Sequence, residues 1–249
     1  MPTHDFQDAI SLAEDVRKRR ISPVEVVEQA LARIAEVNPR LNAFLAVFGD
    51  QARAAARKAE RLVMQKRRGK LPPLLGVPVS VKDIVFTTEA PTTAGSRIFG
   101  DGIVVEHDAP VVRRLRRAGA IIIGKTSLHE VALGVTSANE HFGPVRDPHD
   151  PERVAGGSSG GSAVAVATGC GPLSIGSDTR GSIRVPASCC GVTGLKPTRD
   201  LVSLEGVVPL SASLDHLGPI ALTAADCALM LEAMVAPRYA GRFTAAARK

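Results

Sequence analysis

A serine-bearing loop follows a short apolar segment in the last third of the chain. It reads Gly-Ser-Asp-Thr-Arg-Gly-Ser-Ile-Arg over residues 176–184, directly after the predicted strand 173–175. A serine on a tight turn can present its hydroxyl together with backbone N–H groups aimed at one point. A nucleophile and its oxyanion hole need such an arrangement. The loop therefore suggests nucleophilic catalysis, although a surface turn has a similar composition.

A second loop rich in glycine and serine lies upstream, over residues 156–162. Its glycines resemble those of a phosphate-binding loop, which also needs a lysine and then Ser or Thr after the last glycine. Here Ser162 and Ala163 follow that glycine. The missing lysine argues against a nucleotide-binding loop.

The histidines and cysteines show no metal-binding pattern. His129 and the glutamate after it begin like an HExxH zinc motif, but Leu133 occupies the position of the second histidine. The cysteines include no CxxC pair and two are adjacent, so neither a zinc knuckle nor a disulfide framework is predicted. We interpret the four as buried apolar side chains. They are Cys170, Cys189, Cys190 and Cys227.

Composition limits the class of protein. The chain has 249 residues, of which 45% are hydrophobic and 22% charged, so it can bury a substantial core. No apolar run is long enough to span a membrane, and the N-terminus lacks the features of a signal peptide. We therefore expect a cytoplasmic protein without a membrane partner.

The net charge of +6 raises the question of nucleic-acid binding. Basic residues cluster at 17–20, 66–70 and 113–117, each on or at the end of a predicted surface helix. Nucleic-acid surfaces usually interleave such residues with aromatics, and this chain has no Trp and one Tyr. We interpret the clusters as solvated helix faces and expect no nucleic-acid partner.

The pattern of apolar residues predicts helices first and an α/β arrangement afterwards. Residues 22–25 form a capping box with proline at the first helical position, and the helix that they open should stop near Asn38-Pro39. This pattern is typical of a mixed, largely parallel sheet flanked by helices. The predicted helices cover 5–20, 23–38, 51–68, 108–118, 163–167 and 223–235, and the predicted strands cover 74–82, 120–124 and 173–175.

Several motifs in order resemble the amidase signature family of serine amidohydrolases. The upstream loop reads GGSSGGSA, the second loop reads GSDTRGSIRVPA, and CGVTGLKPT follows. The segment GVPVSVKD over 76–83 is similar to the lysine strand of the family, and 93–96 and 139–144 also match. The resemblance extends from about residue 9 to residue 235.

The resemblance implies a role for each matched position. Ser182 matches the nucleophile, Lys82 the general base, and Ser158 the relay serine that follows a cis peptide bond in the family. The implied reaction is hydrolysis of a carboxylic amide through a seryl acyl-enzyme, with no metal or other cofactor. The implied oxyanion hole consists of the backbone N–H groups of Thr179, Arg180, Gly181 and Ser182.

The role implied for the lysine is chemically coherent. Burial beside Val79 and Val81 would favour the neutral amine, which can accept a proton. Lys82 would take a proton from Ser158, which takes one from Ser182 during attack on the amide. Arg180 departs from the glycine most common in the family. The change keeps the N–H but adds a cation beside the nucleophile.

The chain is much shorter than most members of the family. We interpret it as one incomplete domain, with a helical segment over 1–70, the amidase signature core over 71–235 and a non-homologous tail over 236–249. Truncation would leave apolar surface bare, so we expect weak or absent turnover and association as a homodimer or with a C-terminal half. A truncated or frameshifted gene product, a fragment and a partner for another chain all remain possible origins.

Three functions therefore stay open. The first is an amidase that hydrolyses a small-molecule amide to an acid and ammonia or an amine. The second is the glutaminase-type A subunit of a tRNA-dependent amidotransferase, which would work with further subunits. The third is an inactive remnant of the family.

Overall fold

The protein is built around one mixed β-sheet in the computed structural model, which describes residues 7–65, 71–239 and 241–246. Within these residues, six strands lie in the order β1-β3-β2-β4-β6-β5. The three central strands run parallel, and the outer strands pair antiparallel with their neighbours. The predicted mixed α/β sheet is confirmed. The strands are β1 (Phe44–Val47), β2 (Pro78–Lys82), β3 (Ile121–Thr126), β4 (Leu173–Ser177), β5 (Thr193–Gly194) and β6 (Leu217–Ala221).

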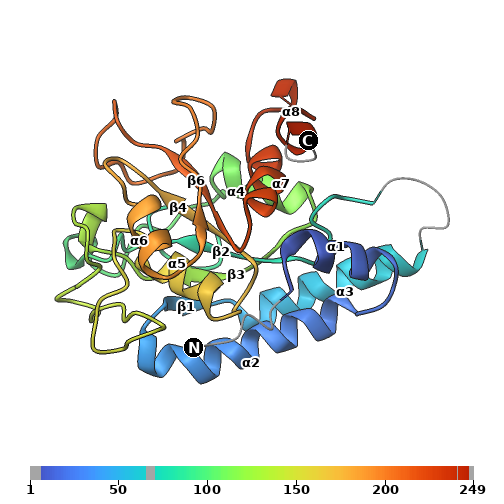
Figure 1. Ribbon diagram of the computed structural model, residues 1–249, viewed down its shortest axis with the longest axis horizontal. Coiled ribbons are helices and arrows are strands. Elements are labelled where there is room, and N and C mark those ends of the chain that lie inside the picture. Colours follow the sequence, from blue (N-terminus) through green and yellow to red (C-terminus); the bar gives the residue numbers. More distant parts are fainter. Residues whose placement is uncertain (1–6, 66–70, 240, 247–249) are drawn as a thin grey trace.

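Helices flank this sheet. Figure 1 shows α2 and α3 side by side along one side of the molecule, whereas α7 and α8 lie toward the opposite side. The α-helices are α1 (Ala9–Arg17), α2 (Pro23–Leu41), α3 (Gly49–Gln65), α4 (Pro110–Arg117), α5 (Gly160–Ala167), α6 (Arg184–Cys189), α7 (Ala224–Met234) and α8 (Arg242–Ala246). Short 3₁₀ helices cover Arg97–Phe99, Glu130–Ala132 and Pro237–Tyr239.

Helix α2 begins as its sequence predicts and ends later. The Ser22 side chain accepts from the N–H of Val24, and the Glu25 carboxylate accepts from the N–H of Ser22, which confirms the capping box. The helix continues through Pro39 to the buried Leu41, which extends its apolar face. The helix then ends at Asn42, whose φ of 53° lies in the left-handed region. Core burial thus outweighs the stop signal of the proline.

The central strands bring two polar side chains to one edge of the sheet. Every residue of β2, β3 and β4 is buried, so these strands form the centre of the core. Lys82 is the last residue of β2 and Ser177 is the last residue of β4. Because these strands are parallel, both residues lie at the same edge, where α/β proteins commonly place their sites.

Strand β6 was not predicted from the sequence, and it contains Pro219. Proline cannot donate to a ladder and usually argues against a strand interior. Here the Pro219 carbonyl accepts from the N–H of Leu195, just beyond the two-residue strand β5. In an antiparallel strand the N–H and C=O of one residue point the same way. The N–H that Pro219 lacks would therefore point toward β5, at the place where the β5–β6 ladder ends.

The described part of the tail contains a short helix attached to α7. The Glu232 carboxylate accepts from the N–H groups of Gly241, Phe243 and Thr244 at the start of α8. It thus satisfies N–H groups that have no partner within the helix. The predicted helix start at 5 and end at 68, and the basic cluster at 66–70, fall wholly or partly outside the described residues.

One of the four cysteine predictions is wrong. Cys170, Cys190 and Cys227 are buried, and burial raises the pKa of the Cys170 and Cys227 thiols to about 11 and about 12. Cys189 is exposed instead. It is the last residue of the short helix α6, where its side chain turns outward while the adjacent Cys190 faces the core. Successive side chains on a helix point about 100° apart, so one can face the core while the next faces solvent.

Candidate active site

Lys82 is a fully buried lysine surrounded by hydroxyl groups. Its Nζ lies 2.6 Å from Ser158 Oγ, 2.8 Å from Ser177 Oγ and 3.0 Å from Ser159 Oγ. Burial lowers the pKa of Lys82 to about 7, and the negative charges of Asp178 and Asp215 oppose that shift. At neutral pH a large fraction of the amine is therefore uncharged and able to accept a proton.

The three hydroxyls around Lys82 are not equivalent. Ser159 Oγ donates to the Ser177 carbonyl at 3.2 Å and also accepts from the Ser177 N–H. Its only hydrogen is used there, so it must accept from Lys82. Only Ser158 and Ser177 can then donate to the lone pair of a neutral Lys82, and Ser158 is the nearer of the two. The sequence reasoning missed both Ser159 and Ser177 as partners of the lysine.

Ser158 is held by its backbone on a loop that needs glycine. The Gly157–Ser158 peptide bond is cis, as the resemblance implies. The Ser158 carbonyl accepts from the His129 N–H at 3.1 Å and from Ser137 Oγ at 3.3 Å. A Cβ at Gly157 would lie 2.7 Å from the backbone nitrogen of Ser137, which leaves no room for another residue.

Ser182 lies beside the same loop. Its side chain is almost buried, and its carbonyl accepts from the Ser159 N–H at 3.1 Å. Among the described residues, no hydrogen bond joins the hydroxyls of Ser158 and Ser182. The structure therefore brings Lys82 and Ser158 into direct contact and connects Ser182 to their loop through the backbone. Catalytic hydrogen bonds often tighten only when substrate is bound.

Asp178 fixes the turn that carries Ser182. Its buried carboxylate accepts from the N–H groups of Gly181 and Ile183 and from the guanidinium of Arg184. Burial by itself raises the pKa of this carboxyl, but these hydrogen bonds outweigh it and hold the pKa below its usual range. The turn is thus built around an ionised carboxylate at neutral pH.

Replacing Asp178 with asparagine should therefore loosen this turn. Asp178→Asn neutralises the partner of Arg184 and leaves an N–H without a good acceptor, so the free energy of unfolding should fall by about 1–3 kcal/mol. Urea unfolding measures the change. The matched control is Asp200→Asn at an exposed carboxylate, which should leave the unfolding midpoint within error. Equal midpoints for the two variants would contradict the role given to Asp178.

The loop offers several backbone N–H groups as anion donors. The N–H of Gly181 already donates to Asp178 at 2.7 Å and is used within the turn. In the part of the chain that the structure describes, no oxygen accepts from the N–H of Thr179, Arg180 or Ser182. Arg180 is exposed, so its cation lies at the surface beside the turn. Three of the four predicted oxyanion donors are thus free.

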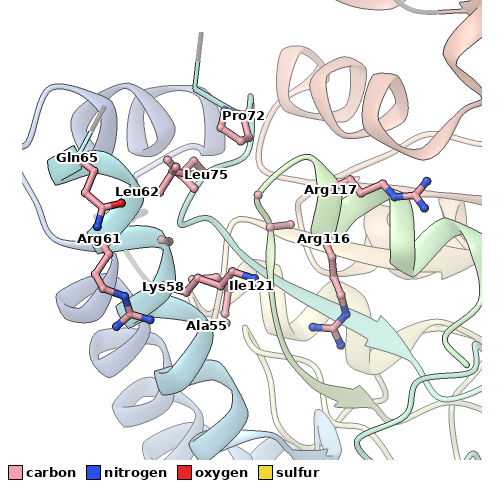
Figure 2. A pocket seen from close by; sticks show the side chains of 13 residues that line it. Ala55, Lys58, Arg61, Leu62, Gln65, Pro72, Leu75, Arg116, Arg117 and Ile121 are labelled. Atoms are coloured by element: carbon pink, nitrogen blue, oxygen red, sulfur yellow. The ribbon is translucent and has the colours of Figure 1, made fainter. Parts of the chain in front are cut away.

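A cavity of about 630 Å³ lies elsewhere, between α3 and the turn that joins α4 to β3. Figure 2 shows its apolar lining, which includes Leu62, Leu75 and Ile121, and the basic side chains Lys58 and Arg61 at its margin. Lys82, Ser158 and Ser182 do not line it. The cavity is therefore separate from these three candidate catalytic residues.

The described residues add two further findings. Over 7–65, 71–239 and 241–246, no helix is both long and apolar enough to cross a bilayer. In the same ranges, no three His, Cys, Asp or Glu side chains are grouped so that they could hold a metal ion.

Comparison with known proteins places the chain in a family. The family model described as Amidase matches residues 25–241. The chain belongs to the Amidase family. Among solved structures, the peptide amidase of Stenotrophomonas maltophilia superposes with a TM-score of 0.88 at 36% identity, covering 97% of this chain and 50% of that one.

Curated relatives of this Amidase-family chain carry different names. The A subunit of the glutamyl-tRNA(Gln) amidotransferase of Coxiella burnetii (strain RSA 493 / Nine Mile phase I) is 45% identical over 90% of this chain and 45% of its own length. The AtzE subunit of the 1-carboxybiuret hydrolase of Pseudomonas sp. (strain ADP) is 44% identical over 92% of this chain and 50% of its own length. The chain thus spans about half the length of the relatives it matches.

Proposed function

We propose that this chain carries the acylation machinery of an amidohydrolase. Ser182 attacks the carbonyl carbon of an amide, Ser158 relays the proton of Ser182 to Lys82, and the free N–H groups of the loop stabilise the oxyanion. The proton returns to the leaving nitrogen, and water then hydrolyses the acyl-enzyme to release the acid. The observation that carries the proposal is the 2.6 Å contact between a fully buried Lys82 and Ser158.

The test separates acylation from turnover. The chain is incubated with a serine-directed fluorophosphonate, and intact mass and peptide mapping identify the labelled residue. Release of ammonia or amine from simple aliphatic and aryl amides is measured in parallel. A single adduct on Ser182 supports the proposal. An unlabelled Ser182 in folded protein contradicts it, whatever the amide assay shows.

A second candidate is the glutaminase-type A subunit of a tRNA-dependent amidotransferase. The identity of 45% to the A subunit of glutamyl-tRNA(Gln) amidotransferase favours it. The same catalytic set would then release ammonia from glutamine. Co-purification with two further subunits and tRNA, and preference for glutamine over other amides, would support this candidate. Equal turnover of simple amides by the isolated chain would favour the amidase.

The pKa of Lys82 predicts how the labelling rate depends on pH. Only the neutral amine can accept a proton, and the pKa of Lys82 is lowered to about 7. The rate of Ser182 labelling should therefore increase about tenfold per pH unit below pH 7 and level off above it. A stopped-flow or quenched labelling series from pH 5 to pH 9 measures the profile. A rate that still rises at pH 9 would show an ordinary, hydrated lysine.

A further inference from the structure

A second lysine, Lys125, is buried next to the loop that follows β2. Only 1% of its side chain is exposed. Its Nζ donates to the Val85 carbonyl at 2.6 Å and to Thr92 Oγ1 at 2.7 Å, and it lies 3.0 Å from Asp83 Oδ1. Burial lowers the pKa of Lys125, and the Asp83 carboxylate opposes that shift. Two buried charges are costly unless they are paired, so this pair needs an explanation.

Lys125 does not lie on the side of the sheet where Lys82 contacts the serines. Register pairs Val81 with Lys125 and Lys82 with Thr126 on the parallel strands β2 and β3. Successive side chains of a strand point to opposite faces, so Lys125 shares a face with Val81. Thr126 shares the other face with Lys82, and its Oγ1 lies 2.8 Å from Ser162 Oγ on α5. The face of Lys82 is therefore the one that α5 covers. Lys125 thus makes no direct contact with the catalytic hydroxyls.

Asp83 connects the pair to Lys82 because it is the next residue in the chain. Its Oδ2 accepts from Thr93 Oγ1 at 2.5 Å and from the Thr93 N–H at 3.0 Å. Its backbone carbonyl accepts from the Ala94 N–H at 2.9 Å. The pair therefore fastens the segment 92–94 to the end of β2, where Lys82 is located.

The same segment continues to the backbone of Ser158. The Gly95 carbonyl accepts from Asn139 Nδ2 at 2.7 Å, and this amide also donates to the Leu128 carbonyl. The N–H of His129, the residue after Leu128, then donates to the Ser158 carbonyl at 3.1 Å. An unbroken chain of hydrogen bonds and peptide bonds thus runs from the buried pair to both partners of the 2.6 Å contact.

We propose that Asp83 and Lys125 are positioning residues that hold Lys82 and Ser158 in register for proton transfer. This inference rests on the proposed function for its catalytic meaning. The pair acts from the opposite face of the sheet, because it fixes the end of β2 and the loop that supports Ser158. A misplacement of about 1 Å at such a contact can slow a reaction about 100-fold.

The experiment compares a double variant with a milder one. Asp83→Asn combined with Lys125→Met removes both charges and keeps the side-chain volumes, whereas Thr93→Val removes one hydroxyl that donates to Asp83. Each is labelled with fluorophosphonate, and the rate is expressed per folded molecule. In parallel, ¹³Cε-lysine NMR follows the titration of Lys82, assigned from Lys82→Met. The charged groups that act on Lys82, Asp178 and Asp215, are unchanged in both variants.

We expect labelling at least about tenfold slower in both variants. The pKa of Lys82 should rise because a loosened site lets water reach the amine. The control for lost stability alone is Met230→Ala in the core of α7, where truncation leaves a cavity and destabilises the fold. It should unfold at lower temperature with an unchanged rate per folded molecule and an unchanged Lys82 titration.

Folded variants with the parent rate and the parent Lys82 titration would overturn the proposal and leave the pair a purely structural element. If the double variant does not fold, Thr93→Val decides by the same two measurements. A parent chain that is never labelled at Ser182 counts against the proposed function. The NMR titration then still decides whether the pair positions Lys82.

Discussion

Ser182→Ala is expected to abolish covalent labelling of the chain by fluorophosphonate while leaving the fold intact. The variant removes the hydroxyl oxygen that the proposal assigns to the bond with phosphorus or carbon, so the rate should fall by about 10⁴-fold or more. The turn itself is held by Asp178 through the N–H groups of Gly181 and Ile183, which the substitution leaves in place. Intact mass spectrometry measures the adduct, and circular dichroism measures the fold.

The matched control is Ser188→Ala, which removes an exposed serine six residues further along, on α6. It should be labelled at the parent rate. An adduct that persists in Ser182→Ala would move the nucleophile to another serine. Loss of the adduct in both variants would point to a general disturbance of this region.

Lys82→Met is expected to separate activity from stability. Methionine has a similar length and cannot accept a proton, so labelling of Ser182 should slow by about 10²–10⁴-fold, the usual contribution of a general base. Burial disfavours the charged amine, and this lowers the pKa of Lys82. An apolar side chain avoids that cost, although three hydroxyls lose a partner. We expect an unfolding midpoint no lower than that of the parent.

Lys82→Arg and Lys58→Met complete this test. Arginine stays charged and cannot serve as a base, so the first variant should be as slow as Lys82→Met. Lys58 is exposed on α3, and its replacement should change neither the rate nor the stability. Retained labelling in Lys82→Met would remove Lys82 from the reaction. If Lys82→Met lost much of its stability as well as its labelling rate, the role of Lys82 would be structural.

Local signals predicted those elements whose causes are local. The capping box at 22–25 set the start of α2, and the apolar segments gave β2, β3 and β4. Long-range contacts decided the rest. Leu41 carried α2 beyond Pro39 because its burial outweighs the proline, and β6 formed around Pro219 because the neighbouring strand ends there. A sequence pattern does not contain the position of a partner strand.

The candidate site likewise has a part that the sequence could predict and a part that it could not. Motif order was enough to select Lys82, Ser158 and Ser182 as candidates, and the structure brings the first two into contact. Ser159 and Ser177 could not be selected, since their contact with Lys82 depends on which strand ends next to β2. Nor could the sequence show that the Gly181 amide is used by Asp178. Such contacts arise only when separate segments meet.

The complete burial of Lys82 has a consequence for the isotopic course of the proposed reaction. The amine has no contact with solvent, so a proton that it takes from Ser158 should return through Ser158 faster than it exchanges with bulk water. The hydrogen lost by Ser182 would then be the one delivered to the departing nitrogen. Acylation would conserve its own hydrogen, and exchange with the medium would be confined to the step in which water enters.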